Sequence, residues 1–372
     1  MKIVIDARTA TPHFPGIGRY VSNLIEAMTP FRDEISLHII QNQSQVNNRI
    51  PETYRSTPTN VSVFSLKQQW VIPKLVKRVS GSLYHSTYYL MPYRVKIPIV
   101  FTCYDLIPII YPRYFQHVQR SIYKIAHLIA AKASSHVIAI SMSTKSDLMR
   151  HLSVEDQKIS VIPLAADPHF SPQTEESIDD VRCVYKLPQR YCLYVGTNKP
   201  HKNLLGLLEA WKLLNESKAL EGHCLVIAGH WDSRYPEAKE FTYKSGLSEA
   251  VMFIGDVKDE DLPKIYSGAT LFIHPSFYEG FGLPVIEAMS CGTAVACSNI
   301  SSLPEVAGDA AIFFDPTNTK DIAAALGGII ADRSKLGSLR EKSIHRAARF
   351  SWHQTAINTI EAYRKVCDSF NV

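Results

Sequence analysis

The sequence of 372 residues lacks the features that mark a membrane-spanning, disulfide-bonded or repeat protein. It has no run of about 18 apolar residues, so we expect no segment to cross a membrane. Its seven cysteines are scattered without a C-x-x-C pair, which predicts reduced thiols and neither a disulfide framework nor a structural zinc site. With 46% hydrophobic and 20% charged residues, the chain has an ordinary globular composition and is long enough for two domains.

The first residues lack the basic and then long apolar pattern of a signal peptide. The stretch "MKIVIDA" reads instead as a β-strand. We therefore expect a cytoplasmic protein.

Negative charge is nearly absent from one part of the chain. Residues 67 to 132 include ten basic residues and one acidic residue, Asp105. Within them, "WVIPKLVKRVSG" (70–81) predicts a helix with one apolar face and with Lys74, Lys77 and Arg78 turned away from it. This helix is either a core helix with a solvated basic face or a site of weak, peripheral docking on anionic lipid at the inner face of a membrane. We expect no nucleic-acid partner.

Apolar strands alternate with helical stretches in both halves of the chain, which indicates parallel sheets covered on both faces. "VSVFSL" (61–66) is one of the expected strands. A polar, proline-bearing stretch, "DPHFSPQTEESIDD" (167–180), reads as a linker. The fold class is therefore α/β, with two Rossmann-like, doubly wound domains that face each other across a cleft. Their expected limits are 1–170 and 171–350, and residues 351–372 form a terminal helix.

The stretch "HPSFYEGFGLPVIEAMSCG" (274–292) places Glu279 and Glu287 eight positions apart in a strand, glycine turn and helix. Pro284 suits the first helical position and Gly292 the stop. Free N–H groups and the positive dipole end at such a helix start favour an anion. The glutamates either flank an anionic ligand or serve only as dipole partners and caps.

Two further loops carry weaker signals of the same kind. "TPHFPGIGRY" has Gly16 and Gly18 directly before a helix, which indicates either a tight turn or a phosphate or sugar contact. "VGTNKPHKN" places Lys202 after the first strand of the second half, where an ammonium group can neutralise a pyrophosphate. The alternative for Lys202 is an ordinary surface lysine.

The combination of these motifs resembles the retaining glycosyltransferases of family 4, bacterial polysaccharide-biosynthesis type, which have the GT-B fold. The resemblance is strongest in the E-x7-E signature of Glu279 and Glu287 with "GFGLP" between them, and "YVGTNKPHKNLLGLLEAW" and "DARTATPHFPGIGRY" also match. It implies that Glu279 binds hydroxyls of the donor sugar and Glu287 the ribose, and that the terminal helix packs back on the first domain. The implied donor-binding residues also include Gly16, Gly18, Gly196, Thr197, Lys202, Val257, Phe281, Gly282 and Leu283; the implied catalytic residues are Glu279, Lys202, Asp105 and Tyr104.

Two positions depart from the family pattern. Thr197 stands where many relatives have an arginine, which leaves Lys202 with more of the phosphate charge to offset. Tyr104 stands where many have a histidine that touches the donor sugar or the acceptor. Asp105, beside it, acts as a base or orients the acceptor.

The resemblance and the motifs together predict a metal-independent retaining hexosyltransferase of polysaccharide biosynthesis. Its donor is expected to be a UDP-hexose such as UDP-glucose, and its acceptor a saccharide or a polyprenyl-linked saccharide. The sequence has no D-x-D-like acidic cluster, so we expect no metal, and no cofactor besides the donor. The alternatives are a GDP-mannose-dependent mannosyltransferase, a nucleotide-sugar epimerase and a non-catalytic nucleotide-sugar binder. ADP-glucose is a further candidate for the donor.

Overall fold

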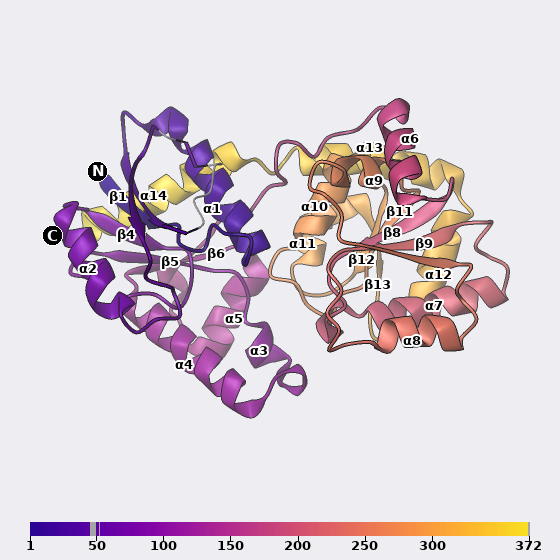
Figure 1. Cartoon of the computed structure of the whole chain (residues 1–372), viewed down its shortest axis with the longest axis horizontal. Helices are drawn as coiled ribbons and strands as arrows, with labels where there is room; N and C mark the ends of the chain where they lie inside the picture. Colours follow the sequence, from indigo (N-terminus) through magenta and orange to yellow (C-terminus); the bar gives the residue numbers. More distant parts are fainter. Residues whose placement is uncertain (45–49, 52, 371–372) are drawn as a thin grey trace. The chain divides into compact units, whose positions relative to one another are not determined.

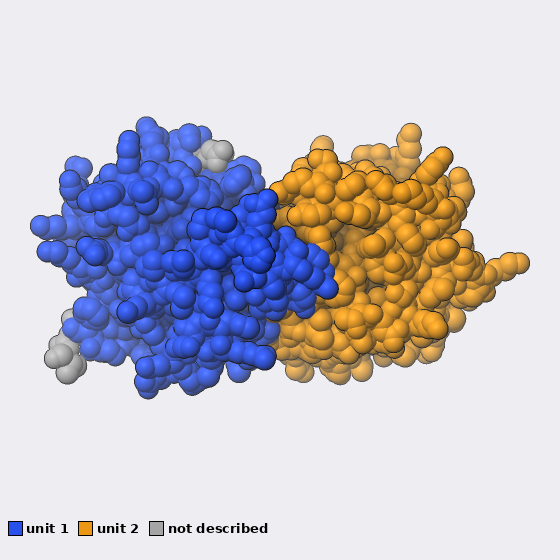
Figure 2. Space-filling model, turned by 90° about the horizontal axis from the view of Figure 1, so that it is seen from below, with its two compact units in different colours: residues 1–164, 351–372 blue, residues 165–350 orange. Residues whose placement is uncertain are grey.

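A computed structural model describes residues 1–44, 50–51 and 53–370 and divides the chain into two compact units (Figure 1). Unit 1 comprises residues 1–164 and 351–372, and unit 2 comprises residues 165–350. Figure 2 shows unit 1 in blue and unit 2 in orange. The chain therefore leaves unit 1 once, forms unit 2 and returns.

Unit 1 is built on a parallel sheet with helices on both faces. Among the described residues, seven strands pair in the order β3-β2-β1-β4-β5-β6-β7. They are β1 (Lys2–Asp6), β2 (Ser36–Asn42), β3 (Arg55–Thr59), β4 (Leu83–Ser86), β5 (Ile99–Cys103), β6 (His136–Ala139) and β7 (Ile159–Val161). The helices are α1 (Pro15–Ala27), α2 (Gln68–Arg78), α3 (Ile107–Ile110), α4 (His117–Ala133), α5 (Met142–Leu152) and α14 (Trp352–Phe370). The strand order reverses beside β1, so the loops after β1 and β4 diverge there, as at ligand sites of open α/β sheets.

Unit 2 repeats this plan. Within the described part of the chain its six parallel strands have the order β10-β9-β8-β11-β12-β13. They are β8 (Tyr191–Val195), β9 (Cys224–Ala228), β10 (Val251–Gly255), β11 (Leu271–His274), β12 (Val295–Ser298) and β13 (Ala311–Phe314). The helices are α6 (Glu175–Tyr185), α7 (Leu204–Glu216), α8 (Glu237–Lys244), α9 (Leu262–Gly268), α10 (Leu283–Ser290), α11 (Leu303–Ala307), α12 (Thr319–Ile330) and α13 (Arg333–Ala347). The expected pair of doubly wound parallel sheets is thereby confirmed.

The long helix α14 belongs to unit 1, although it follows unit 2 in the sequence. The Tyr363 hydroxyl lies 2.6 Å from His85 Nδ1 on β4, and the Thr355 hydroxyl donates to the carbonyl of Pro163. The ring of Trp352 lies against Tyr20 of α1. Buried contacts with β4 and α1 thus hold the end of the chain on unit 1.

The prediction of a strand at residues 61–66 was wrong. The strand in this part of the sheet is β3, which pairs with β2 at the edge. Serine side chains form local turns across residues 61–66, since Ser62 Oγ accepts from the N–H of Phe64. Phe64 is exposed. Pro58 lies in β3, and an edge strand is the place in a sheet that tolerates proline. The alternating apolar pattern of 61–66 therefore belongs to a turn with one buried residue, Val63.

The expected linker at 167–180 is helical in its second part. Helix α6 begins at Glu175, where the Thr174 side chain accepts from the N–H of Ser177, and it packs against α9 of unit 2. Its residues Ile178 and Val181 are buried.

The apolar face of α2 packs into the core of unit 1. Ile72 and Val76 are buried there, while Lys74, Lys77 and Arg78 are exposed. Ile72 and Val76 of α2 are therefore part of the core, and Trp70, at 64% exposed, is the large hydrophobic residue that α2 presents to solvent. Among the described helices, none is both long and apolar enough to cross a membrane.

Candidate functional site

The loops after β8 and β11 lie side by side at the point where the sheet order of unit 2 reverses. β8 ends at Val195, and its loop reaches α7 through a short 3-10 turn that contains Lys202. β11 ends at His274, and its loop carries Glu279 before α10 begins. Adjacent parallel strands thus bring residues 77 positions apart in the sequence to one site.

Lys202 and Glu279 form a direct ion pair at this site. Lys202 Nζ donates to both carboxylate oxygens of Glu279, at 2.7 and 3.0 Å. The fully buried His274 adds a third hydrogen bond from its Nε2 to Glu279 Oε1, at 2.8 Å. The backbone N–H of Glu279 donates a hydrogen bond to Ser301 Oγ. Side chain and backbone contacts therefore fix the carboxylate of Glu279 in one place.

The environment keeps Glu279 ionised. Burial alone would raise its pKa, but the charges of Lys202 and His274 and their hydrogen bonds hold the pKa of this carboxyl well below its usual range. The neighbouring His201 is neutral at pH 7, because burial and the adjacent Lys202 lower its pKa to about 4. At neutral pH Lys202 therefore faces Glu279 as a cation, whereas His201 carries no charge.

The start of α10 offers unpaired N–H groups next to this ion pair. In the part of the chain that the structure describes, the N–H groups of Gly282 and Leu283 have no hydrogen-bond acceptor. Gly282 has a φ of +98°, and a Cβ there would lie 2.6 Å from a methyl group of Leu303. Only glycine fits this backbone without strain, which explains the second glycine of "GFGLP". Phe281, beside it, is buried and packs edge to face on Phe350.

Glu287 lies one turn into α10 and is buried. Its Oε2 accepts from the hydroxyl of Tyr266 on α9, at 3.2 Å. The two glutamates of the motif are thus held by different partners, and Lys202 pairs with Glu279. A carboxylate on the second turn of a helix does not cap its N-terminus, so the reading of Glu287 as a cap does not apply.

A cavity of about 220 Å³ lies beside the ends of β8, β9 and β10. Glycine backbone at Gly196, Gly229 and Gly255 and the rings of Trp231 and Phe253 contribute to its walls. A Cβ at Gly229 would lie 2.5 Å from the carbonyl oxygen of Gly196, so this wall requires glycine. Glycine and aromatic walls of this kind suit a flat ring.

Thr197 and Val257, also named from the sequence, are close in sequence to residues that line this cavity. The Thr197 carbonyl accepts from the Tyr194 hydroxyl at 2.7 Å, so its backbone is fixed. Val257 is half-buried and follows Gly255 by two positions.

Gly16 and Gly18 lie in the first turn of α1 in unit 1. Gly16 is exposed, and a Cβ there would meet no atom within 4 Å. Gly18 is buried, and a Cβ there would lie 3.4 Å from the Thr11 carbonyl oxygen. Gly18 therefore serves close packing of α1 on the preceding turn, whereas the backbone at Gly16 is open to a ligand.

Tyr104 and Asp105 follow β5 in unit 1. The half-buried Tyr104 packs edge to face on Tyr20 with a ring-centroid distance of 5.4 Å, and burial raises the pKa of its hydroxyl well above the usual value. Its buried hydroxyl has no hydrogen-bond partner among the described residues. Asp105 Oδ1 accepts from the N–H of Ile107 at the start of α3, and its carbonyl accepts from the Tyr123 hydroxyl. Asp105 is half-buried, and these hydrogen bonds from α3 and α4 hold it in place.

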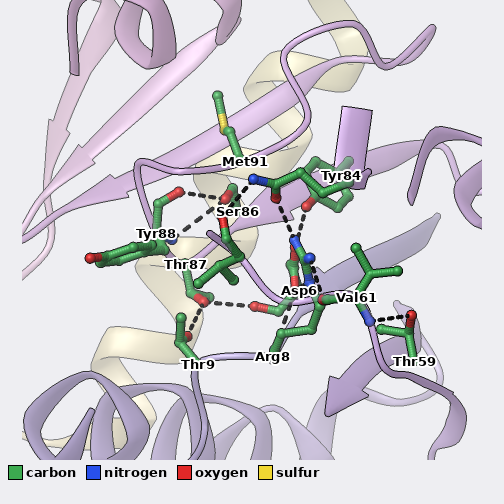
Figure 3. Close-up of polar contacts among 12 residues, drawn as sticks. Asp6, Arg8, Thr9, Thr59, Val61, Tyr84, Ser86, Thr87, Tyr88 and Met91 are labelled. Carbon is green, nitrogen blue, oxygen red and sulfur yellow. Dashed lines mark hydrogen bonds and ion pairs between the residues drawn. The ribbon is translucent and has the colours of Figure 1, made fainter. Parts of the chain in front are cut away.

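An ion pair at the end of β1 was not singled out from the sequence. Figure 3 shows Arg8 turned back onto Asp6, with Tyr84 of β4 on the same carboxylate. Arg8 Nε and Nη2 donate to the two oxygens of Asp6 at 2.8 and 2.6 Å, and Arg8 also binds the Val61 carbonyl and the Gln68 side chain. Burial alone would raise the pKa of Asp6, but Arg8 and Tyr84 lower it. This buried pair ties the loop before α1 to the segment before α2.

His274 and Asn198 were also missed. The sequence "FIHPS" places His274 at the end of a buried strand, which is the signal that could have marked it. Asn198 donates to the carbonyls of Asp232 and Tyr235 and so fastens the loop after β9 to the loop after β8. Across the described residues, no cluster of three or more His, Cys, Asp or Glu side chains is placed to hold a metal ion.

Comparisons with known proteins point to one class of enzyme. The sequence model "Glycosyl transferases group 1" matches residues 184–350, and "Glycosyltransferase Family 4" matches residues 15–170. The O-antigen chain mannosyltransferase B of Escherichia coli is 29% identical over 98% of this chain and 100% of its own length. The serotype-specific mannosyltransferase WbdA of Escherichia coli is 29% identical over 80% of this chain, which spans 38% of that longer protein.

Solved structures show the same fold. Sucrose-phosphate synthase of Thermosynechococcus elongatus has a TM-score of 0.79 at 20% identity, with 99% of this chain and 100% of that chain covered.

Proposed function

We propose that this chain, which belongs to the glycosyltransferases of the GT-B type, transfers mannose from GDP-mannose to a saccharide or lipid-linked saccharide in polysaccharide biosynthesis. The names of the relatives favour mannose over the UDP-glucose expected from the sequence, since both Escherichia coli proteins are called mannosyltransferases. The site observation that carries the proposal is the Lys202–Glu279 pair beside the open start of α10.

In this proposal the donor diphosphate lies at the start of α10. The N–H groups of Gly282 and Leu283 and one N–H of Lys202 stabilise its charge. Lys202 uses two of its three N–H donors on Glu279, so one donor remains for a phosphate oxygen. Glu279 accepts hydroxyls of the sugar, and Glu287 accepts those of the ribose. These groups offset the diphosphate charge without a metal ion.

The remaining residues complete the donor and acceptor sites of the proposal. The base occupies the glycine-lined cavity near Gly196 and Gly255, with Thr197 and Val257 along its approach. In unit 1, Gly16 offers its open backbone to a ligand, and Asp105 orients the acceptor. Tyr104 holds the position of the family histidine, and its ring packs edge to face on Tyr20.

Transfer then proceeds with retention at the anomeric carbon. The acceptor oxygen bonds to that carbon as the bond from the carbon to the phosphate oxygen breaks. The diphosphate takes the electron pair, and one of its oxygens takes the acceptor proton. Charge on the diphosphate grows in this step, so the contacts from Lys202 and from α10 strengthen as the transition state is reached.

Calorimetric titration of GDP, UDP and ADP against the purified chain tests the choice of donor. We expect GDP to bind at least about tenfold more tightly than the other two, since polar groups of a base site left unpaired by the wrong base reduce affinity. Tighter binding of UDP would return the assignment to a UDP-hexose, and equal binding of all three would leave the base site in the cavity without support.

A further inference from the structure

Helix α4 of unit 1 buries small residues and exposes large apolar ones, which is the reverse of an ordinary surface helix. Its buried side consists of Ala126, Ala130, Ala131 and the ring of His127. Its large aliphatic residues point outward: Val118, Ile122, Ile125 and Ile129 are 69%, 60%, 55% and 43% exposed. A surface helix normally buries its large apolar side chains and exposes polar ones. The exposed face of α4 therefore needs an explanation other than the stability of the unit.

The exposed aliphatic residues form a continuous row. They follow one another at spacings of four, three and four positions, which places them on one line along the helix. Lys124, Leu128 and Lys132 follow at intervals of four and form a neighbouring row, and all three are exposed. Figure 1 shows α4 at the outside of unit 1, next to α3 and α5. The helix thus presents an apolar ridge with lysines along its flank.

The stretch of chain that contains the ridge carries charge of one sign. No aspartate or glutamate occurs from residue 106 to residue 146. Arg120, Lys124 and Lys132 of α4 have no ion-pair partner among the residues that the structure describes. An apolar ridge flanked by unpaired cations complements a surface with an apolar interior and anionic groups above it.

A groove of about 450 Å³ continues this surface at the end of α4. Leu128, Ile129 and Lys132 of α4 line one side, and Leu152, Val154 and Lys158 are among the residues beyond them. Glu155 is the acidic residue of this groove. The ammonium of Lys158 donates to the Ala131 carbonyl at the last turn of α4, which braces this end of the helix.

We propose that α4 is the surface through which this protein docks on an anionic lipid bilayer. The apolar ridge enters the boundary between headgroups and acyl chains, and Lys124 and Lys132 lie at the level of the lipid phosphates. Pairing with a second copy is disfavoured, because two such ridges face to face would oppose lysine with lysine. Helix α2, the earlier candidate, has an equally basic face, but its Ile72 and Val76 are buried in the core, and Trp70 is the large hydrophobic residue that it exposes.

Co-sedimentation with vesicles tests the proposal on the whole chain. We expect wild type to pellet with vesicles that contain phosphatidylglycerol and to remain in solution with phosphatidylcholine alone, and salt should release it. An Ile122→Ser, Ile125→Ser variant should bind the anionic vesicles at least about tenfold more weakly, since each loses apolar area that would enter the bilayer. Val184→Ser, at an exposed valine of unit 2, is the control for loss of an exposed aliphatic side chain elsewhere and should bind as wild type does.

A second pair of variants separates α4 from α2 at equal charge. Lys124→Gln with Lys132→Gln should weaken binding several-fold more than Lys74→Gln with Lys77→Gln. These four lysines are exposed, so thermal unfolding should be unchanged in all variants, and circular dichroism checks this.

The proposal is overturned if wild type does not pellet with anionic vesicles, or if the isoleucine variant pellets as wild type does. It is also overturned if α2 proves the more sensitive site. A concentration-dependent dimer in sedimentation velocity that the isoleucine variant abolishes would assign the ridge to self-association. Nucleotide titration tests the donor site of unit 2, and vesicle sedimentation tests α4 of unit 1. A failure of the proposed function can therefore be told apart from a failure of the docking proposal.

Discussion

Replacement of Glu279 by glutamine should reduce sugar transfer by roughly a hundred- to a thousandfold while the nucleotide still binds. The expectation follows from the site, where Lys202 and His274 hold an ionised carboxylate beside the proposed sugar position. Loss of a charged contact to the reacting group costs about this much in turnover. Glutamine keeps the volume of the buried side chain, so the change is confined to charge and hydrogen bonding. Initial rates at saturating donor and calorimetric binding of GDP measure the two quantities.

Glu287→Gln is the comparison that gives this result its meaning. Glu287 accepts a hydrogen bond from Tyr266 of α9, and we expect the loss of its charge to weaken nucleotide binding. Glu249→Gln, at an exposed glutamate of unit 2, controls for the loss of a carboxylate as such. If Glu279→Gln and Glu287→Gln both lowered only the nucleotide affinity and kept full turnover, the assignment of Glu279 to the sugar would be wrong.

Replacement of Lys202 by alanine should weaken donor binding about tenfold or more and should also slow transfer. The ammonium of Lys202 pairs directly with Glu279, and it is the proposed partner of the diphosphate. A charge-assisted hydrogen bond to phosphate accounts for a loss of this size in affinity. Because charge on the diphosphate grows as the sugar bond breaks, turnover should fall as well. Lys199→Ala, at the exposed lysine three positions earlier, should leave both quantities near wild type.

The pH profile separates the charge of Lys202 from a structural role. In wild type the pKa of Glu279 is held well below its usual range, so this carboxylate stays ionised at and above its unperturbed pKa. Without Lys202, burial raises the pKa of Glu279, and kcat/KM should fall at a higher pH on acidification than in wild type. Kinetics that match wild type at every pH would make Lys202 a surface residue without a part in transfer.

The sheet architecture could be predicted because buried parallel strands leave a direct trace in the sequence. Runs such as "IVI" (3–5) and "CLVIA" (224–228) are apolar at every position, as is typical of strands buried on both faces. The edge strand β3 could not be found in this way, since "RSTPT" is polar and owes its conformation to pairing with β2. Tertiary pairing overrides local propensity at a sheet edge.

The candidate site was predictable where backbone chemistry dictates the residue. Gly282 and Pro284 mark the helix start by conformation, and Glu279 and Lys202 follow at strand ends. The hydrogen bond from His274 to Glu279 could not be predicted, because it depends on the packing of β11 against the loop that follows it. Arg8 was missed for the same reason, since its partners come from β1, from Val61 before α2 and from Gln68 at the start of α2.

The outward face of α4 shows a limit of periodicity. Helical spacing of apolar residues reveals that a helix has an apolar face, but the sequence does not say whether that face meets the core. Periodicity in 70–81 led to α2, whose Ile72 and Val76 are buried in the core. In α4 the alanines and His127 fill the narrow space against the sheet, and the larger isoleucines remain outside.

The most direct test of the proposed function is the consumption of donor in an equal mixture of GDP-mannose and UDP-glucose. The purified chain is incubated with this mixture and a lipid-linked saccharide extract, and the released GDP and UDP are quantified by chromatography. We expect GDP to accumulate with the extract present, UDP to stay at background, and the Glu279→Gln variant to release neither. Release of UDP in place of GDP, or equal release by wild type and the Glu279→Gln variant, would contradict the proposed function.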